Sequence, residues 1–158
     1  MIPSNQDKSA WCGLGEEAES RFAGRAFRAG CAVYMNPMKA VDKFTHDLMM
    51  VMPADLKTIR TRFNTADRYG IDPKTAFTLN KKDVVRYVEK YPNIILVFDI
   101  DYGDFKSIRY APLREIRRAI KSGVAKLHVY QQRMDDQSGN AKESWVMDAM
   151  WFQELETA

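Results

Sequence analysis

The sequence predicts a single α/β domain in which one mixed central β-sheet is flanked by helices. Apolar segments of strand length alternate with segments of helical periodicity, and glycine or proline separates many of them. One continuous apolar run, Ile94–Ile100, is typical of a strand buried on both faces. The chain has 158 residues, the size of one ordinary domain, with 46% hydrophobic and 28% charged residues. We expect a flexible arm over residues 1–12 and one domain over residues 13–158.

The first expected elements are a helix and a short strand. Residues Gly15–Ala29 have helical character, with acidic residues in the first turn, where they interact favourably with the helix dipole, and Gly30 as a stop signal. The apolar segment Cys31–Met35 predicts a strand that ends before Asn36 and Pro37.

Two further strands are predicted on either side of Pro53. They cover His46–Met52 and Asp55–Thr61, and we expect them to form a short antiparallel hairpin. Proline is tolerated at such a turn because no ladder hydrogen bond is required of it there.

The remaining expected elements alternate between strands and helices. Val84, Val85 and Val88 give the first helix an apolar face, and Pro112 opens the second. In chain order we expect a strand at Thr75–Leu79, a helix at Lys81–Lys90, strands at Ile94–Ile100 and Phe105–Tyr110, a helix at Leu113–Lys121, a strand at Val124–Tyr130 and a polar loop at Gln131–Asn140.

Composition limits the function classes. The formal net charge of +3 permits a polyanionic partner without requiring one. Cys12 and Cys31, together with two histidines, do not compose a structural zinc site, and reduced thiols fit a cytosolic protein. The longest apolar runs are too short to cross a bilayer, so we expect a soluble, intracellular protein with no membrane partner.

A pattern of carboxylates and lysine predicts metal-dependent phosphodiester hydrolysis. Acidic side chains hold a divalent cation that polarises the phosphate and activates water, and a nearby lysine offsets developing charge. Asp55 and Lys57 lie two positions apart on a predicted strand, so they share a face. The expected hairpin would bring Asp47 close to them.

Three Asp-x-Lys triplets occur in the chain, and their contexts differ. The triplet at 72–74 has proline in its centre, which excludes it from a central strand. The triplet that joins Asp104 to Lys106 follows Asp99 and Asp101 on an apolar strand, and it is a rival metal site. Asp104, however, falls in a turn, where aspartate is favoured for local backbone bonding alone.

The first predicted helix offers a further acid for the site. Of Glu16, Glu17 and Glu19, only Glu19 has apolar neighbours at all of the positions +3, +4 and +7, so it lies on the face expected to contact the sheet. An unpaired carboxylate is costly there, and a metal or Lys57 would compensate it. The alternative is a glutamate at the helix border that reaches into solvent.

These motifs resemble the PD-(D/E)XK nuclease superfamily. The segments that carry the resemblance are Glu19–Phe22, Thr45–Met50 and Asp55–Thr58, and Tyr130–Trp145 resembles small viral members related to Holliday junction resolvases. The order of elements matches over most of residues 15–130, but only a few positions match as motif. An aspartate, Asp55, also replaces the glutamate that is commoner in the family's x-Lys motif.

The resemblance implies a restriction-endonuclease-like core and an endonuclease, virus-encoded in the small members, that hydrolyses DNA with Mg²⁺ or Mn²⁺. By this matching Asp47 and Asp55 would be metal ligands, Lys57 would position the water or the phosphate, and Glu19 would be an accessory ligand. Branched or structured DNA is the substrate implied by the resolvase-like members. The alternative is a catalytically silent protein that binds nucleic acid or serves assembly with the same fold.

Basic and aromatic residues suggest two kinds of partner surface. Arg60, Arg62 and Lys81 are candidates for DNA phosphate contacts. The aromatic residues near the C-terminus are expected to pack against the core or a partner chain, which makes a homodimer compatible with the sequence; they are Trp145, Trp151 and Phe152.

Overall fold

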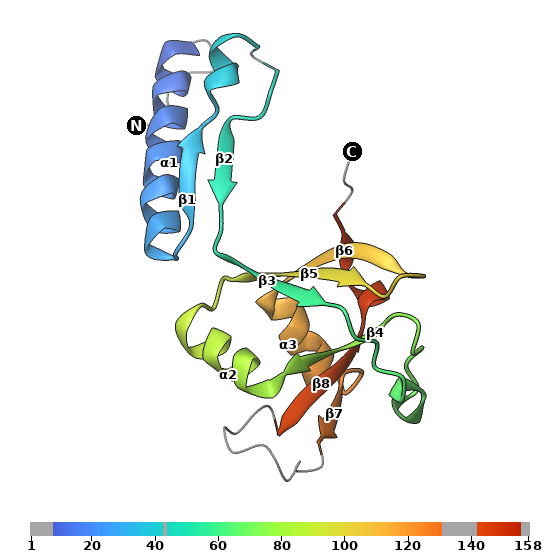
Figure 1. Ribbon diagram of the computed structural model, residues 1–158. Coiled ribbons are helices and arrows are strands. Elements are labelled where there is room, and N and C mark those ends of the chain that lie inside the picture. The colour runs from blue at the N-terminus through green and yellow to red at the C-terminus, as the bar shows by residue number, and fades with distance from the viewer. Residues whose placement is uncertain (1–7, 43, 131–141, 156–158) are drawn as a thin grey trace. The chain divides into compact units, whose positions relative to one another are not determined.

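The computed structural model describes residues 8–42, 44–130 and 142–155, and side chains from residue 13 onward. The chain divides into two compact units, Met1–Pro53 and Ala54–Ala158, each described by itself below. The predicted α/β class is confirmed, because helices and strands alternate along the chain (Figure 1). No helix in the described part of the chain is long and apolar enough to span a membrane.

The first unit contains one helix and one two-stranded sheet. Helix α1 covers Lys8–Arg28, strand β1 covers Ala32–Met35, and strand β2 covers Leu48–Val51. Within the predicted arm the residues from Lys8 onward are helical, and residues 1–7 lie outside the described residues. Because α1 begins before Gly15, its glutamates lie in the middle of the helix, and its first turn has no acidic residue.

A buried asparagine holds the segment between β1 and β2. Asn36 is 5% exposed, and its side-chain amide donates to the carbonyl oxygen of His46 at 2.9 Å and accepts from the Met38 N–H at 3.1 Å. The Asn36 N–H also donates to the carbonyl oxygen of Asp47 at 2.9 Å. These bonds cap the short 3₁₀ helix Pro37–Ala40 and fix the backbone just before β2.

The predicted hairpin on either side of Pro53 is wrong. Strand β2 pairs with β1, whereas β3 (Ala54–Ile59) pairs in parallel with β5 (Ile95–Asp101). The reason lies in the connection, since only two residues, Met52 and Pro53, separate β2 from β3. A two-residue hairpin needs positive φ at its turn, and proline fixes φ near −65°.

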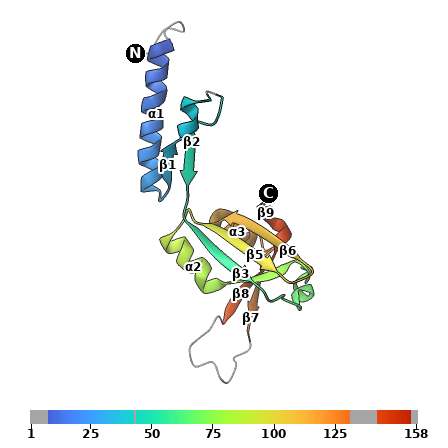
Figure 2. The same cartoon turned by 45° about the horizontal axis from the view of Figure 1, so that its top comes forward.

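The second unit contains two sheets and two helices, so the expectation of one central sheet is corrected. A mixed sheet has the order β3-β5-β6-β9, and a fully antiparallel sheet has the order β4-β8-β7 (Figures 1 and 2). The remaining elements are β4 (Ala76–Asn80), α2 (Lys81–Lys90), β6 (Lys106–Pro112), α3 (Leu113–Lys121), β7 (Lys126–Val129), β8 (Glu143–Asp148) and β9 (Gln153–Glu154). Helices α2 and α3 begin and end as predicted.

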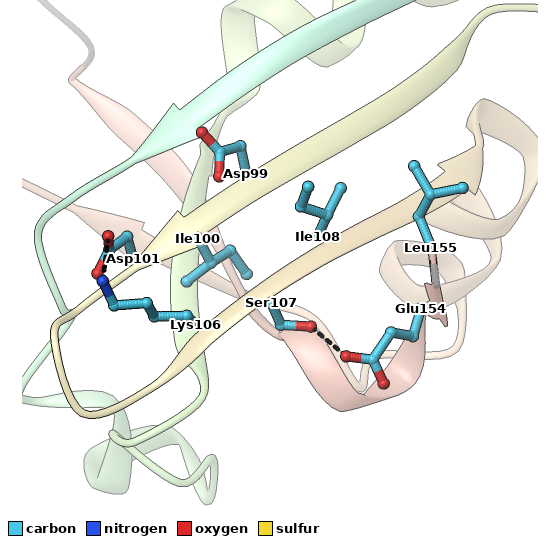
Figure 3. A pocket seen from close by; sticks show the side chains of 8 residues that line it. All are labelled: Asp99, Ile100, Asp101, Lys106, Ser107, Ile108, Glu154 and Leu155. Carbon is cyan, nitrogen blue, oxygen red and sulfur yellow. Dashed lines mark hydrogen bonds and ion pairs between the residues drawn. The ribbon is translucent and has the colours of Figure 1, made fainter. Parts of the chain in front are cut away.

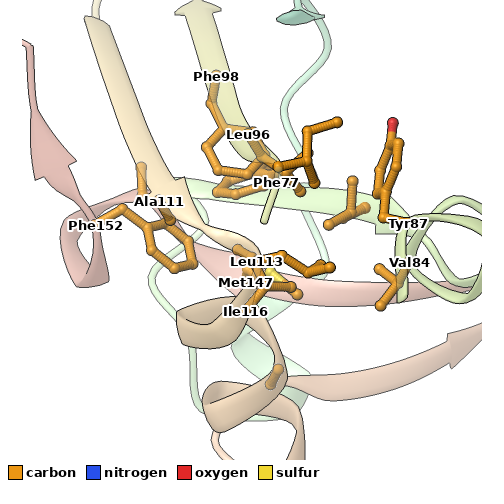
Figure 4. Close-up of a cluster of buried hydrophobic side chains, with 14 of the residues drawn as sticks. Phe77, Val84, Tyr87, Leu96, Phe98, Ala111, Leu113, Ile116, Met147 and Phe152 are labelled. Carbon is orange, nitrogen blue, oxygen red and sulfur yellow. The ribbon is translucent and has the colours of Figure 1, made fainter. Parts of the chain in front are cut away.

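One hydrophobic core joins both sheets and both helices of this unit (Figure 4). Phe77 of β4 and Phe98 of β5 are fully buried, with ring centroids 4.7 Å apart. Ile116 of α3 and Met147 of β8 are also fully buried in this core. The alternation of buried and half-buried residues along β5 shows that one face of the mixed sheet is directed to this core.

The C-terminal aromatic residues mostly pack in or against this core. Phe152 is 5% exposed within it, Trp145 packs against it, and Trp151 remains 39% exposed. Strand β8, which carries Trp145, was not predicted from the sequence. The predicted polar loop at 131–140 lies outside the described residues.

Candidate active site

Asp55 and Lys57 share the core-directed face of the mixed sheet. Along β3 the residues Asp55, Lys57 and Ile59 are half-buried, whereas those between them are exposed, so the predicted common face is confirmed. In the parallel register Asp55 pairs with Leu96 and Lys57 pairs with Phe98, both of which are core residues. Paired residues of neighbouring strands point to the same face, which places this carboxylate and amine at the rim of the core.

Helix α2 supplies a second carboxylate to this place. The Lys57 ammonium lies 2.9 Å from the nearest carboxylate oxygen of Asp55 and 2.9 Å from that of Asp83. The Tyr87 hydroxyl donates a hydrogen bond to Asp55, and the Lys57 ammonium lies 5.4 Å from the centre of the Tyr87 ring. Asp83, Tyr87 and Arg86 thus join Asp55 and Lys57 in what is named here the Lys57 cluster.

The sequence of α2 explains why these side chains meet β3. The Asn80 side chain accepts from the Lys82 N–H at 3.0 Å and starts the helix immediately after β4. Asp83 and Tyr87 are four residues apart, so they lie on the same helical face. Val84 and Tyr87 are buried, which fixes this face against the core.

Arg86 closes the cluster on its solvent side. Its guanidinium lies 2.9 Å from a carboxylate oxygen of Asp83 and 5.1 Å from the centre of the Tyr87 ring. Asp83 therefore faces two cations, Lys57 and Arg86, with its side chain 22% exposed. A carboxylate that contacts two cations makes charge-assisted hydrogen bonds to both.

The cluster shifts the pKa values of four members, and among them the hydrogen bond to Tyr87, followed by Asp83, raises the pKa of Arg86. Burial opposes the charge of Lys57, but its interactions with Tyr87, Asp83 and Asp55 outweigh burial and raise its pKa above the usual value. Burial alone would raise the pKa of Asp55, but hydrogen bonds from Tyr87 and Lys57 together outweigh burial and lower that pKa. Burial, followed by the bond to Asp55, raises the pKa of Tyr87. Lys57 is therefore an ammonium suited to stabilising charge, not to accepting a proton.

The donor atoms of the cluster fit a hard divalent cation only in part. Asp55 and Asp83 each place a carboxylate oxygen 2.9 Å from the Lys57 ammonium, which occupies the point between them, and Mg²⁺ is commonly bound by one or two carboxylates together with water. Among the described residues, no group of three or more acidic, histidine or cysteine side chains is arranged to hold a metal. Any ion here would thus keep several water ligands.

Asp83 and Tyr87 are members of the cluster that the sequence analysis does not identify as site residues. The helix over Lys81–Lys90 was predicted, and Asp83 and Tyr87 stand on the side of Val84, so their common face was readable. That this face meets β3 depends on the parallel pairing of β3 with β5, which the expected hairpin had excluded.

Two predicted site residues belong to the first unit. Asp47 is exposed and forms an ion pair with Lys39. Glu19 is half-buried, and with Ala23 and Val33 it lines a hollow beside β1; the exposed Glu16 lines the same hollow, and Glu17 is exposed elsewhere on the helix. Glu19 thus lies beside the two-stranded sheet of β1 and β2, whereas the sequence analysis expected one central sheet, and the roles of Glu19 and Asp47 at a metal stay predictions.

The rival acids Asp99 and Asp101 occupy the opposite face of the same sheet. Along β5 they alternate with the buried core residues, and they line a hollow of about 590 Å³ with Lys106 and Glu154 (Figure 3). Their charges are compensated separately: Asp99 pairs with Arg60, and Asp101 with Lys106 at 3.1 Å. The Gly103 N–H, then Lys106, lowers the pKa of Asp101.

Asp104, the remaining rival acid, points elsewhere. It is exposed in the turn between β5 and β6, as predicted, and it pairs with Arg62. The Arg62 hydrogen bond lowers the pKa of Asp104. The rival acids therefore hold separate cations and do not converge on one point.

The three predicted phosphate-binding residues also have carboxylate partners. Arg60 pairs with Asp99, Arg62 with Asp104, and Lys81 with Glu143 at 2.7 Å. The Arg62 guanidinium also stacks 5.1 Å from the centre of the Tyr102 ring. A DNA phosphate at any of these positions would have to compete with a carboxylate, and their contact with DNA stays a prediction.

Comparison with solved structures gives a structural likeness. No family model matches the chain, and no curated protein matches it. Among solved structures, the fold is similar to that of D212, a nuclease from a fusselovirus, with a TM-score of 0.43 and 12% sequence identity. The similarity covers 98% of this chain and 89% of that one.

Proposed function

We propose that the protein is a metal-dependent nuclease that hydrolyses DNA, with the Lys57 cluster at the centre of its active site. The observation that carries the proposal is the Lys57 ammonium held 2.9 Å from two carboxylates, Asp55 on β3 and Asp83 on α2. Phosphodiester hydrolysis needs this combination of an oxygen-rich cation site and a fixed positive charge.

Each member has a defined task in this proposal. Asp55 and Asp83 would hold a Mg²⁺ or Mn²⁺ ion, which supplies Lewis acidity and a more acidic bound water. The Tyr87 hydroxyl fixes the orientation of Asp55. Lys57 stabilises the negative charge that grows on the scissile phosphate, and because its pKa is raised, the proton of the attacking water goes to another acceptor.

The finer parts of the proposal rest on the sequence resemblance. Asp47 and Glu19 are proposed as further metal ligands, and branched or otherwise structured DNA is the proposed substrate. A virus-encoded, intracellular endonuclease is the corresponding biological setting.

A second function is supported because both carboxylates of the Lys57 cluster already have partners within the protein. Asp83 is satisfied by Lys57 and Arg86, and Asp55 by Lys57 and Tyr87, so the contacts that hold α2 against β3 need no metal. A protein that uses the cluster for structure alone would bind nucleic acid or serve assembly without turnover. This is the catalytically silent alternative.

A cleavage assay separates these two functions. The protein is incubated with supercoiled, linear and four-way-junction DNA, with Mg²⁺ or Mn²⁺ and with a chelator. The variant Lys57→Ala is compared with Lys106→Ala, which removes the lysine of another Asp-x-Lys triplet on the opposite face of the sheet. Metal-dependent cleavage that Lys57→Ala loses and Lys106→Ala keeps supports the nuclease. DNA binding without cleavage under every condition supports the silent alternative.

A further inference from the structure

Four cations lie on one face of helix α3. They stand at positions i, i+3, i+4 and i+7, so they form one stripe along the helix, and all are exposed: Arg114, Arg117, Arg118 and Lys121. Leu113 and Ile116, on another side of α3, are buried in the core (Figure 4). Packing against the core therefore directs these four residues, named here the α3 stripe, towards solvent.

The cations of the α3 stripe have no carboxylate partners within the described part of the chain. By contrast, each of the predicted phosphate-binding residues, Arg60, Arg62 and Lys81, is paired with a carboxylate. Like charges at these helical spacings repel one another, and a row of phosphates would relieve the repulsion. The α3 stripe therefore complements a polyanion better than the three predicted residues do.

A hollow of about 290 Å³ lies beside the α3 stripe. Arg118, a member of the stripe, lines the hollow together with Glu115 of α3 and with Trp151, which is 39% exposed. Gly123, whose φ is 76°, turns the chain back after α3, and Val124 then forms another wall. The hollow thus combines an exposed aromatic ring with a guanidinium and a carboxylate.

The lining of this hollow suits a nucleobase. Stacking on Trp151 needs only a flat ring face, which every base has. Glu115 is half-buried and has no partner among the described residues, so it can accept a hydrogen bond from a base amino group. Arg118 can donate to a base edge or to the adjoining phosphate. Because a base inside a duplex is already stacked, the hollow fits a base of a single strand.

The observations favour nucleic acid over an anionic membrane surface as the polyanion. A helix that binds at a membrane interface inserts its apolar face. The apolar face of α3 already packs in the protein core, where Leu113 and Ile116 are buried.

We propose that α3 and Trp151 form a binding site for single-stranded nucleic acid. The α3 stripe contacts successive phosphates, and Trp151 stacks on one base, as in proteins that combine a cationic track with an aromatic platform. The site shares no residue with the Lys57 cluster, and binding here needs neither a metal nor cleavage. The proposal therefore does not rest on the proposed nuclease function, for which it would define a substrate with unpaired bases.

Binding in a chelator tests the proposal without any cleavage. Fluorescence anisotropy follows a labelled single-stranded oligonucleotide, which the wild type should bind more tightly than a duplex of the same sequence. Arg114→Gln with Arg117→Gln removes two phosphate contacts and should reduce the slope of log K against log salt concentration by about 1.4. Trp151→Ala should weaken binding about fivefold or more and leave that slope unchanged, whereas Trp151→Phe, which keeps an aromatic platform, should lose less.

Two matched controls separate this site from general effects. Arg25→Gln with Arg28→Gln removes two exposed arginines of the same spacing from α1, and Tyr91→Ala removes an aromatic side chain that is 48% exposed at the end of α2. Both should bind as the wild type does, and circular dichroism confirms that each variant is folded. Equal losses in test and control variants, preference for the duplex, or binding to phosphatidylserine vesicles without binding to the oligonucleotide would overturn the proposal.

Discussion

Lys57 and Asp83 are 26 residues apart in the chain, and their side chains meet at 2.9 Å between the mixed sheet and α2. The sequence predicts both the strand and the helix that this contact joins. It does not predict the pairing of β3 with β5 that brings the two together. The contact also turns an Asp-x-Lys triplet, which is a common local pattern, into a cluster with two carboxylates.

Removal of the Tyr87 hydroxyl should change the pH dependence of cleavage. The hydrogen bond from Tyr87 is one reason why the pKa of Asp55 is lowered, so Tyr87→Phe should raise that pKa. Because the carboxylate must be ionised to act, the acidic limb of the rate–pH profile should move to higher pH. Tyr102→Phe, which removes a hydroxyl bonded to the Ala76 carbonyl oxygen, is the control and should leave the limb in place.

Asp83 should contribute to metal affinity. We expect Asp83→Ala to weaken Mn²⁺ binding by about tenfold or more, in the range known for groups that support a metal site. Isothermal titration with Mn²⁺ in the absence of DNA measures the change. Asp104→Ala, which removes an exposed carboxylate of the rival triplet, should bind Mn²⁺ as the wild type does; equal losses in both variants would count against a site at Asp83.

The stabilising effect of Asp55 should disappear in acid. Its folded-state pKa lies below the ordinary value of 3.8, so the carboxylate stabilises the fold above that value and loses the effect as the pH falls through the folded pKa. Asp55→Asn should therefore melt below the wild type at pH 7, and the difference should shrink only below the ordinary pKa of 3.8 and vanish once the pH has fallen through the lower folded-state pKa. Thermal unfolding followed by circular dichroism over this range checks it; a constant difference would refute the assignment.

The core beneath the cluster should be far more sensitive than the outer face of the sheet. Phe98 is fully buried, and Phe98→Ala should lower the free energy of unfolding by about 3–5 kcal/mol. Leu56 is on the neighbouring strand with 60% exposure, so Leu56→Ala should change it by about 0.5 kcal/mol or less. Urea unfolding of both variants gives the comparison.

Local patterns predicted most of the helices and strands. Helices α2 and α3 begin and end where amphipathic spacing and Pro112 place them, and β5 follows its continuous apolar run. The shared face of Asp55 and Lys57 follows from the two-residue period of a strand. These features depend only on neighbouring residues, which a sequence shows directly.

The pairing of the strands could not be predicted from local sequence patterns in the same way. The partner of β3 is β5, beyond an intervening strand and helix, and nothing local to Asp55 identifies Leu96 as its partner. The position of Pro53 between two apolar segments predicts a hairpin turn, although the fixed φ of proline opposes the turn that a two-residue connection would need. The contribution of Asp83 was missed for the same reason, because it depends on that pairing.

The location of a bound divalent cation tests the central proposal most directly. Crystals of the protein soaked in Mn²⁺ would give an anomalous scattering peak at the ion. We predict that peak within coordination distance of the carboxylate oxygens of Asp55 and Asp83, on the α2 side of the mixed sheet. A peak beside Asp99 and Asp101, on the opposite face, would contradict the account.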